Sequence, residues 1–388
     1  MTVRENYPIV RVIARTNVGG PSLQVTALMR GLDRDRFPQH LLRGSVEEGE
    51  ADYLLMRATD VEHVDVPGLG RSVKPLDDLR ALVFLIRFMR RTRPVIVHTH
   101  TAKAGTLGRI AGVLARVPIR VHTFHGHVLH GYFSPSVTRA VVLVERVLGR
   151  FTTHTVAVGQ QVLDDLVAAK IARRDSSSVV APGVQDPGLR DRGEARKLLG
   201  VSLDATVVTF VGRLTRIKRG ERFISLARRL EAEFGNATFV VVGDGPEREM
   251  LEREARGLGN VVFAGWQSDM AQVYAASDLL VLTSDNEGMP VALIEGAMQG
   301  VPAVATDVGS VRQVVSDGET GRVVAEGDAL VEAVRELLGD EATMRQMGAS
   351  AATRAMALFS EQRLVSDYAQ LYDTLIVNSQ RLQRHRRR

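Results

Sequence analysis

The chain has 388 residues and a formal net charge of +5, and this length exceeds one ordinary hydrophobic core, which indicates two domains. Its 45% apolar and 24% charged residues are typical of a soluble globular protein, and no apolar run approaches the roughly 18–20 residues of a membrane span. The N-terminus lacks the pattern of a secretory signal, and the absence of cysteine excludes disulfides and thiolate sites, so we expect a cytoplasmic protein.

The first half of the chain alternates apolar runs with amphipathic stretches. A strand is expected at 7–14, followed by a glycine loop and a helix through Met29, whereas polar residues and glycines break up 33–74. Beyond this region the predicted helices are 77–91, 102–116, 136–148 and 160–169, and the predicted strands are 95–98, 119–124, 154–158 and 179–180. Such alternation predicts a parallel sheet with helices on both faces.

The apolar pattern lapses in a stretch that is rich in proline and glycine, and we predict a linker at 186–204. The alternation restarts with a strand at 206–211 and continues to about Val324, and terminal helices are expected at 328–358 and 361–377. The predicted division is therefore 1–185, 186–204, 205–358, a crossover helix at 359–378 and a basic tail at 379–388. Two such α/β halves would form a cleft at their strand C-termini, where open α/β sheets bind ligands.

The most informative stretch, NEGMPVALIEGAMQGVP, begins at Asn286 and places Glu287 and Glu295 eight positions apart. A buried strand should precede it, Pro290 suits the first turn of a helix, and Gly300 suits the left-handed residue that ends one. The helix N-terminus carries partial positive charge and suits a phosphate. Two carboxylates beside a phosphate indicate neutral hydroxyls as their targets, and a nucleotide-sugar offers that combination.

This stretch resembles the Glu-x7-Glu motif of the retaining glycosyltransferases of family 4, of the kind that builds bacterial cell-surface polysaccharides. The resemblance implies the GT-B fold class, α/β with two Rossmann-like domains facing across a cleft and a C-terminal helix that crosses back to the first domain. It assigns acceptor binding to 1–185 and nucleotide-sugar binding to 205–358. Within the motif it implies that Glu287 contacts the donor sugar, that Glu295 binds the ribose hydroxyls, and that Gly288, Met289, Pro290 and Val291 line the donor site.

Further motifs follow in the order that this family has. Directly after the strand at 206–211, Arg213 and Lys218 flank a turn, and two cations there would neutralise a diphosphate. Gly243 opens a Gly-Asp-Gly-Pro turn that borders the nucleotide pocket in the family, although its glycines are also explained by the turn alone. In the first half, Gly19 and Gly20 resemble the loop that closes over the donor phosphate and the acceptor, but here Pro21-Ser22 follows.

Six of the ten histidines crowd one region: His98, His100, His122, His125, His127 and His130. His125 follows a predicted strand and precedes Gly126, and this resembles the family element whose histidine contacts a sugar hydroxyl. A zinc site made of imidazoles is an alternative, and His98 and His122 fit ordinary core histidines better. The motifs imply no metal and no cofactor, because two cations and a helix terminus already neutralise the diphosphate.

Charge distribution suggests the acceptor. The chain has no Asp or Glu from Leu79 to Val144 but ten Arg or Lys, and its last eight residues include five arginines. Such a surface attracts nucleic acid or an anionic membrane, and no nucleic-acid-binding module is found, so we expect docking on the inner face of the plasma membrane. A polyprenyl-diphosphate-linked glycan or a glycolipid would then be the acceptor, although a soluble acceptor stays open.

The predicted function is transfer of a hexosyl or N-acetylhexosaminyl unit, from a UDP-linked or other nucleoside diphosphate donor, to an acceptor hydroxyl with retained configuration. Two explanations of how the configuration is retained stay open. Glu287 would stabilise the oxocarbenium ion, or the leaving phosphate would remove the acceptor proton on the same face. One alternative is a nucleotide-sugar 2-epimerase of the same fold, which would need carboxylates in both halves. A non-catalytic sugar-binding scaffold is another, although Lys218 and both glutamates are retained.

Overall fold

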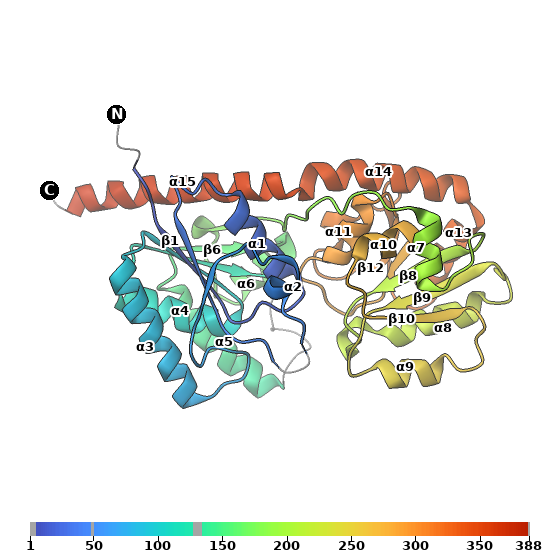
Figure 1. Ribbon diagram of the computed structural model, residues 1–388, viewed down its shortest axis with the longest axis horizontal. Coiled ribbons are helices and arrows are strands. Elements are labelled where there is room, and N and C mark those ends of the chain that lie inside the picture. Colours follow the sequence, from blue (N-terminus) through green and yellow to red (C-terminus); the bar gives the residue numbers. More distant parts are fainter. Residues whose placement is uncertain (1–4, 48–49, 127–133, 387–388) are drawn as a thin grey trace. The chain divides into compact units, whose positions relative to one another are not determined.

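The computed structural model describes residues 5–47, 50–126 and 134–386. The chain divides into two compact units, and each is built on its own sheet (Figure 1). The first unit comprises Met1–Val184 together with Glu361–Arg388, and the second comprises Gln185–Ser360. None of the helices within the described ranges is long and apolar enough to cross a membrane.

In the described residues of the first unit, seven parallel strands follow the order β3-β2-β1-β4-β5-β6-β7. These strands are β1 (Ile9–Ile13), β2 (Gln39–Arg43), β3 (His63–Asp65), β4 (Ile96–His100), β5 (Ile119–Phe124), β6 (His154–Ala157) and β7 (Ser177–Val179). The helices are α1 (Gly20–Gly31), α2 (Tyr53–Arg57), α3 (Pro75–Thr92), α4 (Ala102–Leu114), α5 (Pro135–Gly149), α6 (Gln160–Ala168) and α15 (Glu361–Arg386). The order reverses between β1 and β4, which is the doubly wound arrangement.

Alternation along the strands divides the core of this unit between two faces of the sheet. Ile9 and Ile96 pack with side chains of α1 and α15, whereas Val10 and Val97 pack with side chains of α3 and α4. Figure 1 shows the same layers, with α1 and α15 over one face and α3, α4 and α5 over the other. Helix α15 therefore completes the first unit although it comes last in the sequence, as the expected crossover helix does.

The second unit has six parallel strands in its sheet among the described residues, in the order β10-β9-β8-β11-β12-β13. These strands are β8 (Thr206–Val211), β9 (Ala237–Val242), β10 (Val261–Gly265), β11 (Leu279–Leu282), β12 (Ala303–Thr306) and β13 (Gly321–Val324). The helices are α7 (Arg192–Leu199), α8 (Gly220–Leu230), α9 (Arg248–Glu254), α10 (Met270–Ala276), α11 (Val291–Met298), α12 (Val311–Val314), α13 (Asp328–Gly339) and α14 (Glu341–Phe359).

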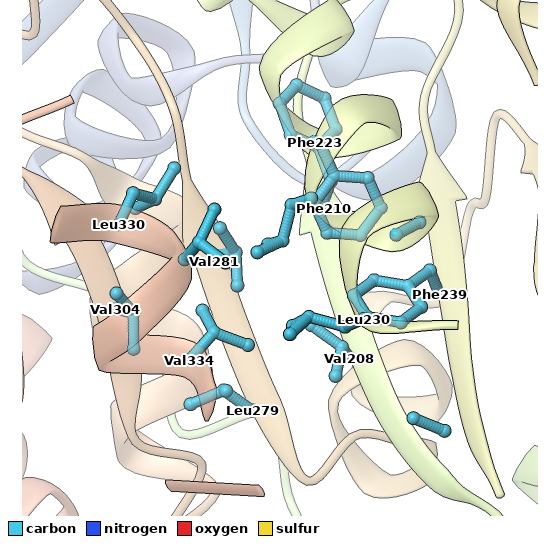
Figure 2. Packing of buried hydrophobic residues seen from close by; sticks show 14 of the residues in the cluster. Val208, Phe210, Phe223, Leu230, Phe239, Leu279, Val281, Val304, Leu330 and Val334 are labelled. Atoms are coloured by element: carbon cyan, nitrogen blue, oxygen red, sulfur yellow. The ribbon is translucent and has the colours of Figure 1, made fainter. Parts of the chain in front are cut away.

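Aromatic and branched side chains fill one face of this second sheet (Figure 2). Phe223 of α8 contacts both Phe210 and Phe239 of neighbouring strands, with 5.7 Å between the ring centroids of each pair. Rings at this separation gain favourable tilted or edge-to-face contacts in addition to their burial. Leu330 and Val334 of α13 close the cluster over β11 and β12. The resulting rigid sheet fixes the loops that leave its strands.

Most predicted elements are confirmed, and the strands expected at 119–124 and 206–211 have the predicted ends. The broken-up region at 33–74 instead contains β2, α2 and β3. The expected single helix at 328–358 is interrupted at Asp340, whose side chain caps α14 by accepting from Thr343 N at 3.0 Å.

Two boundaries differ from the predicted division. The expected linker at 186–204 contains α7, which is capped by Asp191 at its start and ends at the left-handed Gly200. Ala195 and Leu199 of this helix are buried in the core of the second unit, so the segment is part of that unit. The last helix runs to Arg386, so most of the expected tail at 379–388 is helical.

Candidate functional site

The loops that leave neighbouring strands β9, β8, β11 and β12 lie at one edge of the second sheet, because parallel strands end at the same side. They are closely packed. A Cβ atom on Gly243, which has φ +132°, would lie 1.9 Å from the carbonyl oxygen of Gly212. A Cβ atom on Gly309, at φ +53°, would lie 1.8 Å from the carbonyl oxygen of Glu287. Only glycine fits these positions, and the close approach fixes the loops against one another.

Glu287 lies at the centre of this edge and is almost fully buried. Its Oε1 accepts two hydrogen bonds, from Lys218 Nζ at 2.5 Å and from Ser284 Oγ at 2.6 Å. The lysine comes from the loop after β8 and the serine from the loop after β11, so the pairing depends on the order of the strands. A carboxylate held by a cation and a hydroxyl from two different loops keeps one orientation.

The backbone around Lys218 is fixed as firmly as its side chain. Thr283 Oγ1 donates to the carbonyl oxygen of Lys218 at 2.8 Å, and Arg219 adopts a left-handed conformation that turns the chain into α8. Arg222, in the first turn of that helix, donates to the carbonyl oxygen of Thr283 at 2.9 Å. Arg213 lies in the same loop as Lys218 and its side chain is exposed. The loop therefore presents two cationic residues on a constrained backbone.

Glu295 lies in α11, which begins directly after Pro290. The carboxylate accepts a hydrogen bond from Tyr274 OH at 2.7 Å. Burial of the phenol, together with the nearby carboxylate, raises the pKa of Tyr274 well above its ordinary value, so the phenol remains a donor at neutral pH. Gly288, Met289 and Val291 complete the turn between β11 and α11, and the predicted left-handed conformation of Gly300 after the helix is confirmed.

The first unit supplies the remaining predicted residues. Gly19 and Gly20 form the start of α1, where the Gly19 carbonyl oxygen accepts from Ser22 N at 3.1 Å. Among the described residues beyond its chain neighbours, a Cβ atom at Gly19 would meet only the ring of Pro21, at 3.9 Å, so this loop backbone is open to close approach. His125 follows β5, and its Nε2 lies 3.0 Å from His100 Nδ1. Exclusion of water from the ring lowers the pKa of His125 to about 3.

The structure thus places Lys218, Gly243 and the 287–295 stretch at one edge of the second sheet. His98 and His122 are buried in the first unit, as expected for core histidines, whereas His127 and His130 lie outside the described residues. Within the described ranges, no group of three or more His, Asp or Glu side chains could hold a metal ion.

Sequence reasoning missed Ser284 and Tyr274, which orient the two glutamates. Ser284 is three residues before Glu287, so its proximity was a usable signal. Tyr274 is 21 residues before Glu295 and lies in a different helix, and nothing local in the sequence indicates that pairing.

Comparisons with known proteins identify the family to which both units belong. A family model described as "Glycosyl transferase 4-like domain" matches residues 19–183, and one described as "Glycosyl transferases group 1" matches residues 191–354. The chain is 27% identical to a UDP-Gal:alpha-D-GlcNAc-diphosphoundecaprenol alpha-1,3-galactosyltransferase of Escherichia coli, over 81% of this chain and 84% of that protein. It is 25% identical to the capsular polysaccharide biosynthesis glycosyltransferase CapM of Staphylococcus aureus, over 91% of this chain and 95% of that protein.

Among solved structures, HepE of Anabaena in complex with UDP has a TM-score of 0.78 at 21% identity, covering 95% of this chain and all of that one. The fold class is therefore GT-B, with two Rossmann-like domains. The two family models together span most of the chain, one on each unit, and the chain belongs to the family 4 glycosyltransferases and is an enzyme that transfers sugar units.

Proposed function

We propose that this enzyme transfers a hexosyl or N-acetylhexosaminyl unit from a UDP-linked sugar to a hydroxyl group of a lipid-linked glycan, with retention of anomeric configuration. The observation that carries the proposal is the joint fixation of Glu287, Lys218 and Glu295 on one edge of the second sheet. Support for the donor and acceptor comes from relatives. HepE has a similar fold and binds UDP, and the E. coli relative acts on a diphosphoundecaprenol-linked sugar.

The second unit would bind the donor. Lys218 and Arg213 would hold the diphosphate, together with backbone N–H groups of Gly288, Met289 and Val291 at the start of α11. Glu295, oriented by Tyr274, would accept hydrogen bonds from the ribose hydroxyls. Because Gly243 has no Cβ atom, the nucleotide could approach the backbone of the loop after β9 closely. From the first unit, the Gly19–Gly20 loop would cover the phosphate and acceptor, and His125 would contact the reacting sugar.

For retention we propose that both contributions act together, with Glu287 stabilising the oxocarbenium ion and the leaving phosphate removing the acceptor proton. Because Oε1 of Glu287 accepts from Lys218 and Ser284, the carboxylate is held in one orientation, from which its charge would stabilise a positive anomeric carbon. The bond from the anomeric carbon to the phosphate oxygen breaks, and the acceptor oxygen forms the new bond on the same face. The acceptor proton moves to the departing phosphate oxygen, which takes up the electron pair of the broken bond.

A donor panel tests this reaction. Purified protein is incubated with UDP- and GDP-sugars, with and without a polyprenyl-diphosphate-linked acceptor, and the released nucleoside diphosphate and the anomeric configuration of the product are measured. We expect one UDP-sugar to be consumed only with acceptor, and Glu287→Gln to lose at least about 100-fold in kcat. Glu341→Gln, on the exposed surface of α14, is the control. An inverted product, or full activity in Glu287→Gln, contradicts the mechanism.

Docking on the inner face of the plasma membrane is the second part of the proposal. Helix α5 exposes Val137, Leu143, Val144 and Val147, and Leu143 is 62% exposed. On the same helix or just after it, Arg139, Arg146 and Arg150 are exposed, whereas Glu145 is buried in an ion pair with Arg109 at 2.7 Å. Apolar side chains beside arginines that have no acidic partner among the described residues are complementary to an anionic lipid surface, where each basic residue contributes about 1 kcal/mol.

Vesicle flotation tests this docking surface. The wild type should float with phosphatidylglycerol vesicles. In the presence of phosphatidylcholine vesicles it should remain in the bottom fraction, unbound. Leu143→Glu together with Arg139→Gln should reduce binding to the anionic vesicles roughly tenfold. Leu198→Glu is the matched control, because Leu198 of α7 is 70% exposed and lies in the other unit. Equal binding of the α5 variant, with activity on lipid-linked acceptor intact, rejects this surface.

A further inference from the structure

The first unit has an arginine at the centre of its sheet. Arg11, in the otherwise apolar β1, is fully buried, and its Nη2 donates to Gln39 Oε1 at 2.8 Å. Its Nη1 lies 2.9 Å from His98 Nδ1 and 3.3 Å from Tyr372 OH. All the partners that the described residues supply to this guanidinium are neutral. Because an arginine side chain keeps its proton in proteins, the strand carries a buried positive charge that has no carboxylate partner among the described residues.

Strand alternation places this charge beside the histidines. Arg11 pairs in register with His98, and Ile13 pairs with His100, which in turn pairs with Thr123 on β5. Side chains at alternate positions share a face, so Arg11, His98 and His100 lie on the face that α15 covers. His125 comes two residues after Thr123 and continues that row.

The hydrogen bonds determine which nitrogen of each ring carries the proton. A guanidinium only donates, so His100 Nε2, 3.4 Å from Arg11 Nη1, must accept. A ring that accepts at Nε2 is neutral and carries its proton on Nδ1. His100 Nδ1–H therefore donates to His125 Nε2 at 3.0 Å. His125 in turn accepts at Nε2, and its own proton lies on Nδ1.

Helix α15 anchors the row from above. Tyr372 OH lies 2.6 Å from His98 Nδ1, and His98 Nε2 lies 2.7 Å from Thr123 Oγ1. The hydroxyl of Thr123 is also 2.9 Å from Tyr368 OH. Burial and then the charge of Arg11 hold the pKa of His98 far below its ordinary value, and burial and the neighbouring imidazoles and Arg11 do so for His100. Both rings are therefore neutral near pH 7, as the hydrogen-bond pattern requires.

We propose that Arg11 is a positioning residue that acts through His100 to hold His125 as the neutral tautomer with its proton on Nδ1. His125 then donates a hydrogen bond from Nδ1 to an oxygen of its ligand and is not the base that removes a proton. Resting on the proposed function, that oxygen belongs to a sugar hydroxyl. The tautomer itself follows from the first unit alone and is independent of the reaction.

Nitrogen NMR of the imidazole rings in the full-length protein tests the tautomer directly. We expect a protonated Nδ1 and an unprotonated Nε2 for both His100 and His125. Arg11→Met should shift His125 toward the Nε2–H form, and Arg11→Lys should restore part of the wild-type signal because it keeps a buried donor. A wild-type His125 protonated on Nε2, or an unchanged His125 signal in a folded Arg11→Met variant, overturns the proposal.

Two further variants keep the test valid if loss of Arg11 unfolds the protein. His100→Leu removes the donor to His125 while retaining Arg11, and it should free Nε2 of His125 for protonation. Val97→Ala is the packing control, because Val97 lies on the same strand but faces α3 and α4. It should leave the His125 signal unchanged, and a shift as large as that of His100→Leu would mean that packing alone sets the tautomer.

Kinetics separates this inference from the proposed reaction. In Arg11→Met we expect a roughly tenfold lower kcat with an unchanged KM for the donor, because the donor would be held by the second unit. If the NMR pattern is found and no nucleotide-sugar is consumed, the proposed function fails, but the control of the His125 tautomer by Arg11 and His100 stands. If transfer occurs and His125 is protonated on Nε2, the proposed control of the His125 tautomer fails and the proposed function stands.

Discussion

At the residue scale, the glutamates of the candidate donor site are defined by the groups that hold them. Glu287 shares one oxygen between Lys218 and Ser284, and Glu295 accepts from a buried tyrosine. Each carboxylate thus has one fixed orientation before any ligand arrives. Such preorganisation lowers the cost of ordering side chains when the substrate binds.

A double-mutant cycle on Lys218 and Glu287 should separate stability from catalysis. Lys218→Met leaves a nearly buried carboxylate without its cation, and we expect a loss of about 2 kcal/mol in the free energy of unfolding. Adding Glu287→Gln removes that charge and should restore most of the stability, while transfer remains absent. Chemical denaturation and donor turnover measure the two effects. Additive losses of stability would show that the pair is not coupled.

Tyr274→Phe removes the hydroxyl that donates to Glu295 and little else. We expect a loss of about 1 kcal/mol in stability and a several-fold rise in KM for the donor, with kcat nearly constant, because the ribose contact acts in the ground state and the transition state alike. Tyr368→Phe is the matched control, since it removes a buried hydroxyl from the first unit. Its donor KM should not change.

At the element scale, the site depends on how closely the loops approach one another. The turn after β9 lies against the loop after β8 at Gly243, and the loop after β12 lies against Glu287 at Gly309. The strands β8, β9, β11 and β12 are neighbours in the sheet, so this packing joins segments about 100 residues apart into one surface.

Gly243→Ala should therefore damage the site more than its small change in size suggests. Its Cβ atom would overlap the Gly212 carbonyl oxygen, and the positive φ adds strain, so we expect a loss of at least about 2 kcal/mol in stability and weaker UDP binding by calorimetry. Gly339→Ala, at the end of α13, would place its Cβ atom within 4 Å of no heavy atom of the described residues outside its own helical turn, and it should change stability by less than about 1 kcal/mol. Similar behaviour of the two variants would contradict the close packing.

At the scale of the whole molecule, the two units differ in their titratable groups. All ten histidines belong to the first unit, and residues 185–360 contain none. Burial lowers the pKa of His98, His100, His122 and His125 below that of the unfolded chain. As the pH falls, the histidines of the unfolded chain therefore bind protons before those of the folded chain do. The free energy of unfolding that the neutral histidines contribute is complete above about pH 6.5 and is lost progressively below it.

Each of these histidines should cost the first unit up to about 1.4 kcal/mol per pH unit well below pH 6.5. We expect hydrogen exchange, followed by mass spectrometry at pH 7, 6 and 5, to show falling protection in β1, β4 and β5. Protection in β8 and β11 should remain nearly constant over that range once the intrinsic exchange rates are corrected. Parallel loss of protection in both units would mean that they unfold together or that other groups dominate.

Local patterns in the sequence predicted much of this protein. Apolar runs of four to six residues between amphipathic stretches sufficed for the alternating strands and helices, because burial on both faces of a parallel sheet requires continuous apolar strands. The same holds for the left-handed Gly300, where the conformation follows from the residue type. The strands and the helix of region 33–74 were not predicted, because its strands are short and contain polar residues. Arg43 of β2 is buried only through ion pairs with Asp52 and Asp65.

The sequence by itself determined the fold class, the family and the positions of the two glutamates, since these depend on residue types at short, regular spacing. The tertiary structure decided which residues act together. Ser284 and Lys218 meet on Glu287, Tyr274 meets Glu295, and Arg11 reaches His100 from a strand 89 residues away. Strand order and register create these contacts, and neither can be predicted from the local pattern of apolar and polar residues. Helix α15 likewise completes the first unit only because the folded sheet offers it a face that combines apolar side chains with hydrogen-bond partners for Tyr372.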